Sequence, residues 1–300
     1  MLAKIHSAAI VGLEAVPITV EVDIINQGLP KFIIVGLPDK AVDESRERVR
    51  FAIKNAGYEF PNRRITVNLA PGDIPKEGSM YDVPIALGVL IASNQIRTFD
   101  KPALFYGELA LDGSLRPVPG AVLFSIAARE HGYTHVFLPQ HNYAEAKLIP
   151  DVHIIPVAHL TQLARFITTS EPIALSLDLD TQSLEIPADI SNPDTDMKHI
   201  QGQFQVKRAL EIAAAGNHNL FMVGPPGAGK TLLAKSFATI LPPLSDPEIL
   251  ELTKLYSASG LLNKTDPIIR KRPFRPPPII PDQSPQLLVV ARYLALVKYH

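Results

Sequence analysis

The segment Gly224-Pro-Pro-Gly-Ala-Gly-Lys-Thr231 constrains the fold more than any other part of the chain, because it fits the pattern G-x-x-x-x-G-K-[ST]. Such a loop binds phosphate where a buried strand precedes it and a helix follows it. Residues 220–223 are an apolar run with the length of a central parallel strand. Residues 231–240 follow with helical spacing and one apolar face, made of Leu232, Leu233, Phe237 and Ile240.

These residues predict a site for ATP and Mg²⁺. Lys230 is expected to reach the β- and γ-phosphates, and Thr231 is expected to hold Mg²⁺ through its hydroxyl. The other residues expected to bind the cofactor belong to the loop and the first helical turn: Gly224, Pro225, Pro226, Gly227, Ala228, Gly229 and Leu232. The glycines allow backbone N–H groups to turn toward a phosphate, and the helix N-terminus adds a positive dipole end. The alternative is a plain Gly/Pro turn, which does not explain why strand, loop, Lys-Thr pair and helix all agree.

Length and composition indicate a globular chain of about two domains. It has 300 residues, of which 46% are hydrophobic and 20% charged, and its net charge of −1 gives no global field that favours nucleic acid. Cysteine is absent, which excludes disulfides and a Cys nucleophile and fits a reducing compartment. With no apolar run long enough to span a membrane, we expect a cytoplasmic protein without a membrane partner.

The first domain is expected to run over residues 1–168 and to be α/β or α+β with a mixed sheet. Residues 16–25 alternate between apolar and polar side chains, which predicts a half-buried strand. Residues 42–56 predict an amphipathic helix that Asp39 caps, with Glu44, Arg46, Arg48 and Lys54 facing solvent. Further strands are expected at 31–35, 65–69, 103–106, 135–138 and 153–157, and further helices at 83–92 and 122–129.

Two stretches of this domain resemble Lon-type proteases. Pro75-Lys-Glu-Gly-Ser-Met-Tyr-Asp-Val-Pro-Ile-Ala-Leu87 is similar to the stretch that carries their nucleophile, and residues 113–139 are similar to the stretch that carries their catalytic lysine. In this register Met80 replaces the serine and Val122 replaces the lysine, while Ser79 has no lysine partner. Because that chemistry needs a Ser–Lys pair, the resemblance implies the fold and argues against proteolysis. Asp82 is expected to cap a helix or to pair internally.

Residues 169–196 are rich in Pro, Ser, Asp and Thr and predict a polar linker. The second domain then begins at residue 197 and extends to residue 275. Ile200, Gly202 and Gln203 match a segment that packs near the adenine in AAA+ ATPases, which makes Gln203 a candidate nucleotide contact. An ordinary helix start explains the same residues equally well.

Taken together, residues 1–275 resemble the magnesium-chelatase-like AAA+ ATPases of the ComM/YifB type. The matching segments are Ala9-Ile-Val-Gly-Leu13, residues 34–49, Asn68-Leu-Ala-Pro-Gly72 and residues 213–220. The resemblance implies a Lon-protease-like mixed α/β domain followed by a partial P-loop AAA+ domain. It also implies ATP and Mg²⁺ as cofactors, a homo-oligomeric ring, expected to be a hexamer, and DNA as partner, since ComM-type members are branch-migration helicases of natural transformation.

The sequence departs from this family after the phosphate loop. A motor of this class needs an acidic pair at the end of a second core strand and an arginine supplied across the ring. Asp246, Glu248 and Glu251 lie in a Pro-rich loop and an expected helix, so none of them fits the acidic pair. We therefore expect a chain truncated within its ATPase domain and deficient in hydrolysis.

Residues 276–300 do not resemble the family, and we interpret them as a frameshifted tail. Regrouping their codons one base earlier permits the strings H-H-T, G-G-G and P-R-P-G-E, in the order in which the family continues after R-P-F-R. The alternative is a genuine Pro-rich terminus.

Two other functions stay open from the sequence. The first is a metal-chelatase ATPase subunit, against which the Lon-like domain argues. The second is a non-catalytic binding module formed by the first domain, with an inert ATPase remnant.

Overall fold

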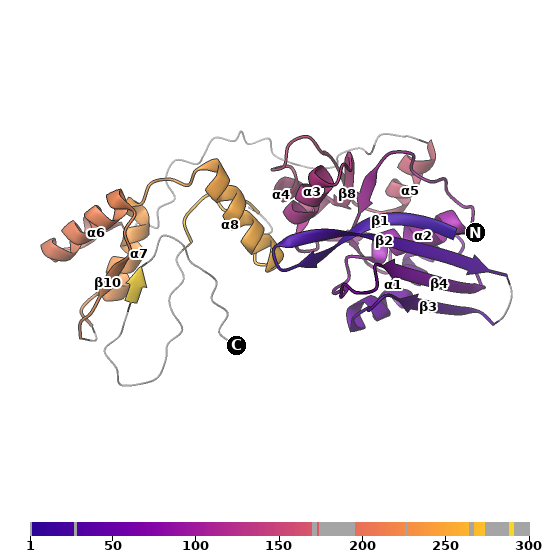
Figure 1. The fold of residues 1–300 in the computed structure, drawn as a ribbon, viewed down its shortest axis with the longest axis horizontal. Helices are drawn as coiled ribbons and strands as arrows, with labels where there is room; N and C mark the ends of the chain where they lie inside the picture. Colours follow the sequence, from indigo (N-terminus) through magenta and orange to yellow (C-terminus); the bar gives the residue numbers. More distant parts are fainter. Residues whose placement is uncertain are drawn as a thin grey trace. The chain divides into compact units, whose positions relative to one another are not determined.

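The computed structural model describes residues 2–26, 29–169, 173, 196–225, 227–263 and 267–273, and the backbone of residues 288–290. The chain divides into two compact units, unit 1 (Met1–Asp178 and Pro247–Ile268) and unit 2 (Leu179–Asp246 and Ile269–His300). Both units mix helices and strands, and the sheets include parallel and antiparallel pairs, as the sequence predicts (Figure 1). Among the helices in the described ranges, none is long and apolar enough to cross a membrane.

Three sheets form the strand framework of unit 1. The four-stranded sheet has the order β1-β2-β4-β3, in which only the β3–β4 pair is parallel. The three-stranded sheet β5-β8-β9 is entirely parallel, and β6 and β7 form a short hairpin. The strands are β1 (Leu2–Val11), β2 (Glu14–Ile25), β3 (Lys31–Val35), β4 (Arg64–Ala70), β5 (Ala103–Phe105), β6 (Glu108–Leu109), β7 (Leu115–Arg116), β8 (His135–Pro139) and β9 (His153–Val157).

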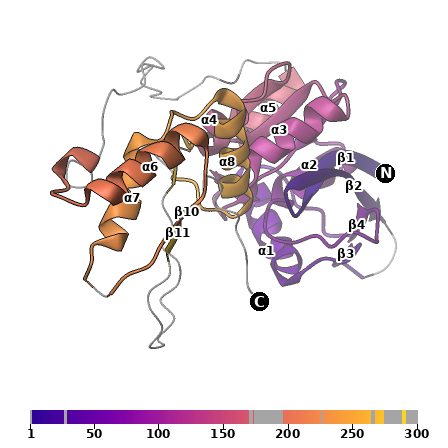
Figure 2. The same cartoon turned by 60° about the vertical axis from the view of Figure 1, so that its left-hand side comes forward.

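The helices of unit 1 pack against these sheets and against one another (Figures 1 and 2). They are α1 (Lys40–Asn55), α2 (Asp82–Ala92), α3 (Ala121–Glu130), the 3₁₀ turn η1 (Gln140–Asn142), α4 (Tyr143–Ala146), α5 (Leu160–Thr169) and α8 (Asp246–Ala258). The expected helices and strands of this part of the chain are thus confirmed, with ends that shift by up to two residues.

Strand β2 buries alternate residues, Ile18, Val20, Val22 and Ile24, as its period-two pattern predicts. Its partner β1 was not predicted from the sequence. β1 also alternates, but it buries the polar Ser7 and the consecutive Ala8 and Ala9, which breaks the apolar period. In the register Ile5↔Val20 and Ala3↔Val22, the buried side chains of β1 form a second apolar row beside the buried row of β2.

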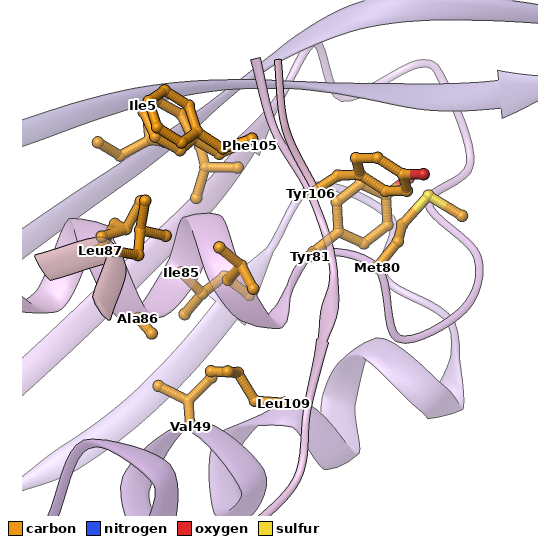
Figure 3. Close-up of a cluster of buried hydrophobic side chains, with 14 of the residues drawn as sticks. Ile5, Val49, Met80, Tyr81, Ile85, Ala86, Leu87, Phe105, Tyr106 and Leu109 are labelled. Atoms are coloured by element: carbon orange, nitrogen blue, oxygen red, sulfur yellow. The ribbon is translucent and has the colours of Figure 1, made fainter. Parts of the chain in front are cut away.

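Helix α2 occupies the centre of unit 1, and all eleven of its residues are buried. It packs against β1, β2 and α1, so apolar side chains are required all around it (Figure 3). Gly88 permits the close approach to the sheet, because a Cβ atom there would lie 2.4 Å from Cγ2 of Val22.

β3, α1 and β4 form a parallel βαβ unit in which Asp39 caps the helix. The Asp39 carboxylate accepts the Val42 N–H at 2.7 Å, which confirms the predicted cap. The expectation that Arg48 faces solvent with Glu44, Arg46 and Lys54 is wrong. Arg48 instead reaches the buried carboxylate of Asp82, and helical spacing cannot reveal a partner that lies 34 residues away.

Unit 2 contains η3 (Met197–His199), α6 (Phe204–Gly216), β10 (Leu220–Met222), α7 (Lys230–Ile240) and β11 (Leu288–Val290). Its apolar core joins α6, α7 and β10 through Leu210, Ala213, Met222, Leu233 and Phe237. Met197 and Ile200 pack against the same cluster. The segment upstream of the phosphate loop is therefore anchored beside the helix that follows the loop.

Candidate nucleotide-binding site

The predicted phosphate loop connects β10 to α7, as a P-loop requires. Gly227 and Gly229 have φ angles of +81° and +80°, whereas Ala228 between them does not adopt a positive φ. Alternating left- and right-handed residues turn successive N–H groups toward one side of the chain, which forms an anion-binding concavity. Gly229 is also the N-cap of α7, so the unpaired N–H groups of the first helical turn lie beside the loop.

Lys230 is the first residue of α7 and its side chain is buried against the loop. Its ammonium donates hydrogen bonds to the carbonyl oxygens of Gly224 at 2.7 Å and Pro225 at 2.8 Å. Both acceptors are neutral, so no carboxylate in the described residues neutralises this cation. The amine is thus held at the loop in a position from which it can exchange carbonyls for the oxygens of an anion.

The other predicted site residues differ in how they are placed. Thr231 is exposed at the second position of α7, and Leu232 is 45% exposed, which corrects its predicted place on the apolar face. Gln203 is the exposed N-cap of α6, with a positive φ of 53°. Pro226 lies outside the described residues.

The strand before the loop differs from the expected central parallel strand. β10 has three residues and pairs antiparallel with β11, in the register Phe221↔Val289. Phe221 is 56% exposed and Val223 is 64% exposed, and only Met222 is buried. A central parallel strand needs strands on both sides and helices on both faces, and the described part of unit 2 supplies one strand neighbour.

Asp246, Glu248 and Glu251 lie on α8. All residues of that helix except Asp246 group with unit 1. Across the described residues, no group of three or more His, Cys, Asp or Glu side chains is arranged to hold a metal ion. The predicted tail, residues 276–300, lies outside the described residues apart from the backbone of β11.

The positions that correspond to the Lon-type nucleophile and lysine are apolar and enclosed. Met80 and Val122 are both buried, and the Met80 sulfur lies near the rings of Tyr81 and Tyr106 (Figure 3). The Ser79 hydroxyl donates to the Glu108 carboxylate. The nearby Lys76 is buried, and its amine donates to the Pro71 carbonyl oxygen.

Arg48 and Asp82 were not identified as a pair from the sequence. The two side chains form two hydrogen bonds, and the Leu109 N–H donates to the same carboxylate at 3.1 Å. Burial nevertheless raises the pKa of Asp82 to about 6, because desolvation of the carboxylate outweighs these bonds. This pair lies in unit 1 and holds α1 against α2, and we assign it a structural role.

Comparison with known proteins identifies relatives for both parts of the chain. Residues 20–142 match a family described as subunit ChlI of Mg-chelatase, and residues 196–283 match one described as magnesium chelatase, subunit ChlI. The chain is 44% identical over 280 residues to the uncharacterized protein YifB of Salmonella typhimurium, which covers 92% of this chain and 53% of the relative. It is 40% identical over 279 residues to the competence protein ComM of Haemophilus influenzae, with the same coverage of 92% and 53%.

A weaker similarity connects part of the chain to proteases. The Lon protease of Mycoplasmopsis agalactiae is 29% identical over 119 residues, which are 38% of this chain and 12% of the protease. The chain spans about half the length of the YifB and ComM relatives.

Proposed function

Because the chain belongs to the magnesium-chelatase-like family that includes YifB and ComM, we propose that Gly224–Thr231 binds the phosphates of ATP as its Mg²⁺ complex. The observation that carries the proposal is the buried Lys230, whose ammonium donates to two neutral loop carbonyls and to no carboxylate among the described residues. Charge-assisted hydrogen bonds to phosphate are stronger than bonds to neutral carbonyls. Binding would therefore replace weaker contacts of Lys230 with stronger ones.

The remaining groups of the site complement Lys230. The N–H groups of the loop and of the first turn of α7 would hold phosphate oxygens, and the Thr231 hydroxyl would hold Mg²⁺. Bound Mg²⁺ would neutralise part of the phosphate charge. Gln203 would lie toward the base, because Met197 and Ile200 pack on the same core as α7.

Calorimetric titration with MgATP tests the proposal. Lys230→Met keeps the buried apolar stem and removes the charge, so we expect affinity to fall about tenfold to a hundredfold. Lys235→Met is the matched control, because Lys235 lies on the same helix and is exposed. Equal affinity of the Lys230→Met variant and the parent chain would refute the assignment of Lys230.

We also propose that this 300-residue chain does not turn over ATP at a motor-like rate. In such motors an acidic pair holds Mg²⁺ and activates water, and a trans arginine stabilises the transition-state charge. Asp246 and Glu251 stand on α8 rather than at the end of a core strand. Steady phosphate release should therefore be the same in the parent chain and in Lys230→Met. Release that the substitution abolishes would contradict this.

For the full-length protein we propose a cytoplasmic homo-oligomeric ring that acts on DNA. The support is the resemblance to the ComM type, together with 40% identity to a protein named for competence. A metal-chelatase subunit is the main rival, since both family descriptions name that enzyme. Nucleotide-dependent unwinding of branched DNA by the full-length protein supports the first function, and its absence together with Mg²⁺ insertion into a porphyrin supports the second.

The predicted division at residues 168, 196 and 275 and the frameshifted tail remain proposals. Translation of the nucleotide sequence beyond codon 276 in the shifted frame tests the tail. An apolar run that ends in Asp-Glu is the expected result, and early stop codons would exclude it.

A further inference from the structure

Unit 1 has a large open groove beside its βαβ unit, far in sequence from the phosphate loop. The groove has a volume of about 920 Å³ and lies between the edge strand β3, helix α1 and the segment that leads into β4. Phe32 and Phe60 are among its lining residues. The charged lining residues are Lys31, Lys40, Arg46, Arg50, Lys54 and Arg63, together with Asp43, Glu44 and Glu47.

The charges are not mixed evenly along the groove. All three carboxylates lie in the first half of α1, and Asp43 is in the first turn, where the helix dipole favours it. Oδ1 of Asp43 is 3.8 Å from Nη2 of Arg46. Arg50 and Lys54 lie one turn apart in the second half of α1. The helix dipole favours a cation at the C-terminus, and this effect alone would explain a lysine at position 54.

The same end of the groove receives cations from two other segments. In a βαβ unit the helix runs opposite to its strands, so its C-terminal end lies near the strand starts. Lys31 is the first residue of β3 and pairs in register with Arg64, whose neighbour in the chain is Arg63. We define the cationic end as Lys31, Arg50, Lys54 and Arg63. Within the described residues, none of these four forms a salt bridge.

Two aromatic rings line the same groove as the cationic end. Phe32 follows Lys31 on β3, and its ring centroid is 5.8 Å from that of Phe60, with the planes at 45°. Both rings are half-buried, so each has an exposed surface recessed in the groove. A bilayer is engaged by protruding apolar side chains, whereas recessed rings beside cations suit flat groups that are linked by phosphates.

We propose that this groove binds single-stranded nucleic acid, with the cationic end on the phosphates and with Phe32 and Phe60 stacking on bases. Stacking of this kind tolerates any base, so binding is expected to be independent of sequence. This groove would be the place where the DNA of the proposed function is held as a single strand. The proposal rests on that function only for the identification of the nucleic acid as DNA. Because the groove does not include the phosphate loop, binding should not require ATP.

Fluorescence anisotropy with a labelled oligothymidylate, without nucleotide, tests the proposal on the full 300-residue chain. Arg50→Gln with Arg63→Gln removes two phosphate contacts, so affinity should fall at least about tenfold and the slope of log K against log salt should shrink by about 1.4. Lys101→Gln with Arg129→Gln is the control, because it removes the same charge at exposed positions outside the groove. Equal losses in the two double variants would overturn the proposal.

A second variant separates nucleic acid from other anions. Phe60→Leu keeps the charge and an apolar side chain, so it should weaken oligothymidylate binding about fivefold or more, while binding of inorganic polyphosphate stays unchanged. Vesicles that contain phosphatidylserine are the lipid probe. The assignment would be overturned if Phe60→Leu bound oligothymidylate as well as the parent chain does. It would also be overturned if the groove variants abolished vesicle binding while oligothymidylate binding persisted. Lys230→Met should bind oligothymidylate like the parent chain, so failure of the ATP site and failure of the groove are distinguishable.

Discussion

Arg48 forms a bidentate contact with the buried carboxylate of Asp82: Nε donates to Oδ2 at 2.7 Å, and Nη2 donates to Oδ1 at 3.1 Å. The bond joins the middle of α1 to the first residue of α2, and the same guanidinium also donates to the Ala41 carbonyl oxygen. Asp82 has no exposed side-chain surface, whereas Arg48 keeps 20%. The pair therefore fixes the packing of two helices at the cost of desolvating a carboxylate.

The titration of Asp82 gives a prediction about stability and pH. Its pKa in the folded protein is about 6, raised by burial, whereas an unfolded Asp titrates near 4. A raised pKa means that the folded state binds the proton more tightly, so this contribution to stability is complete below about pH 4 and is lost as pH rises through about 6. Relative to Asp82→Asn, the parent chain should be about 1 kcal/mol more stable at pH 5 than at pH 8, which means a larger free energy of unfolding at pH 5.

Urea denaturation of both chains at the two pH values measures this difference. Arg48→Met is the companion variant, because it leaves the carboxylate without its cation and should cost about 3–5 kcal/mol at pH 8 but less at pH 5. Arg46→Met is the matched control, since the contact of Arg46 with Asp43 is long and partly exposed. The raised pKa of Asp82 would be contradicted if the difference in free energy of unfolding between the parent chain and Asp82→Asn did not change with pH. It would also be contradicted if the parent chain were relatively more stable at pH 8 than at pH 5.

Gly88 provides a test of the packing of α2. A Cβ atom there would lie 2.4 Å from Cγ2 and 3.1 Å from Cβ of Val22, and Val22 stands on β2 with little freedom to move. Gly88→Ala should therefore destabilise the protein by about 1–3 kcal/mol in chemical denaturation. Gly72→Ala is the control, because no atom lies within 4 Å of its Cβ position.

Adding Val22→Ala to Gly88→Ala should recover part of the loss, because it removes the atom that clashes. The double-mutant cycle would then give a favourable coupling energy. Purely additive effects would show that the approach of α2 to β2 is not what restricts position 88.

Local patterns predicted much of this fold, whereas contacts between distant residues could not be predicted. The alternation of β2 and the Asp39 cap depend on neighbours in sequence, and both are confirmed. Arg48 fits the polar face of a helix, and only the tertiary fold brings Asp82 to it. For the candidate site, the loop and α7 were predictable, but the exposure of Phe221 depends on how many strands flank β10.

Proteolysis should be absent in this chain. Met80 and Val122 carry no nucleophile or base, and the Ser79 hydroxyl bonds to a carboxylate rather than to a lysine amine. Incubation with casein, with and without ATP, should leave the substrate intact over the time in which a Lon protease degrades it. Cleavage that Ser79→Ala abolishes and Ser114→Ala preserves would establish a peptidase and would show that the register with Lon is wrong.

Ser257 connects α8 to the rest of unit 1 through a buried hydrogen-bond chain. Its hydroxyl accepts the Gly120 N–H at 3.1 Å and donates to Oε2 of Glu145 at 2.6 Å. The other oxygen of Glu145 accepts from Nδ2 of Asn142 at 2.7 Å. Leu250 and Ala258 of α8 pack on the neighbouring apolar cluster, so this contact and the hydrogen bonds act on the same helix.

Ser257→Ala should loosen α8 selectively, because it leaves a buried N–H and a buried carboxylate oxygen without this partner, a loss of about 1–3 kcal/mol. Hydrogen exchange read by mass spectrometry should show faster exchange in peptides from residues 246–258, with little change in α2. Ser259→Ala is the matched control, since Ser259 is exposed just after α8 and its hydroxyl donates to the Leu255 carbonyl oxygen. If the two variants exchange alike over α8, the chain from Gly120 through Ser257 to Glu145 does not hold the helix, and its apolar contacts alone do.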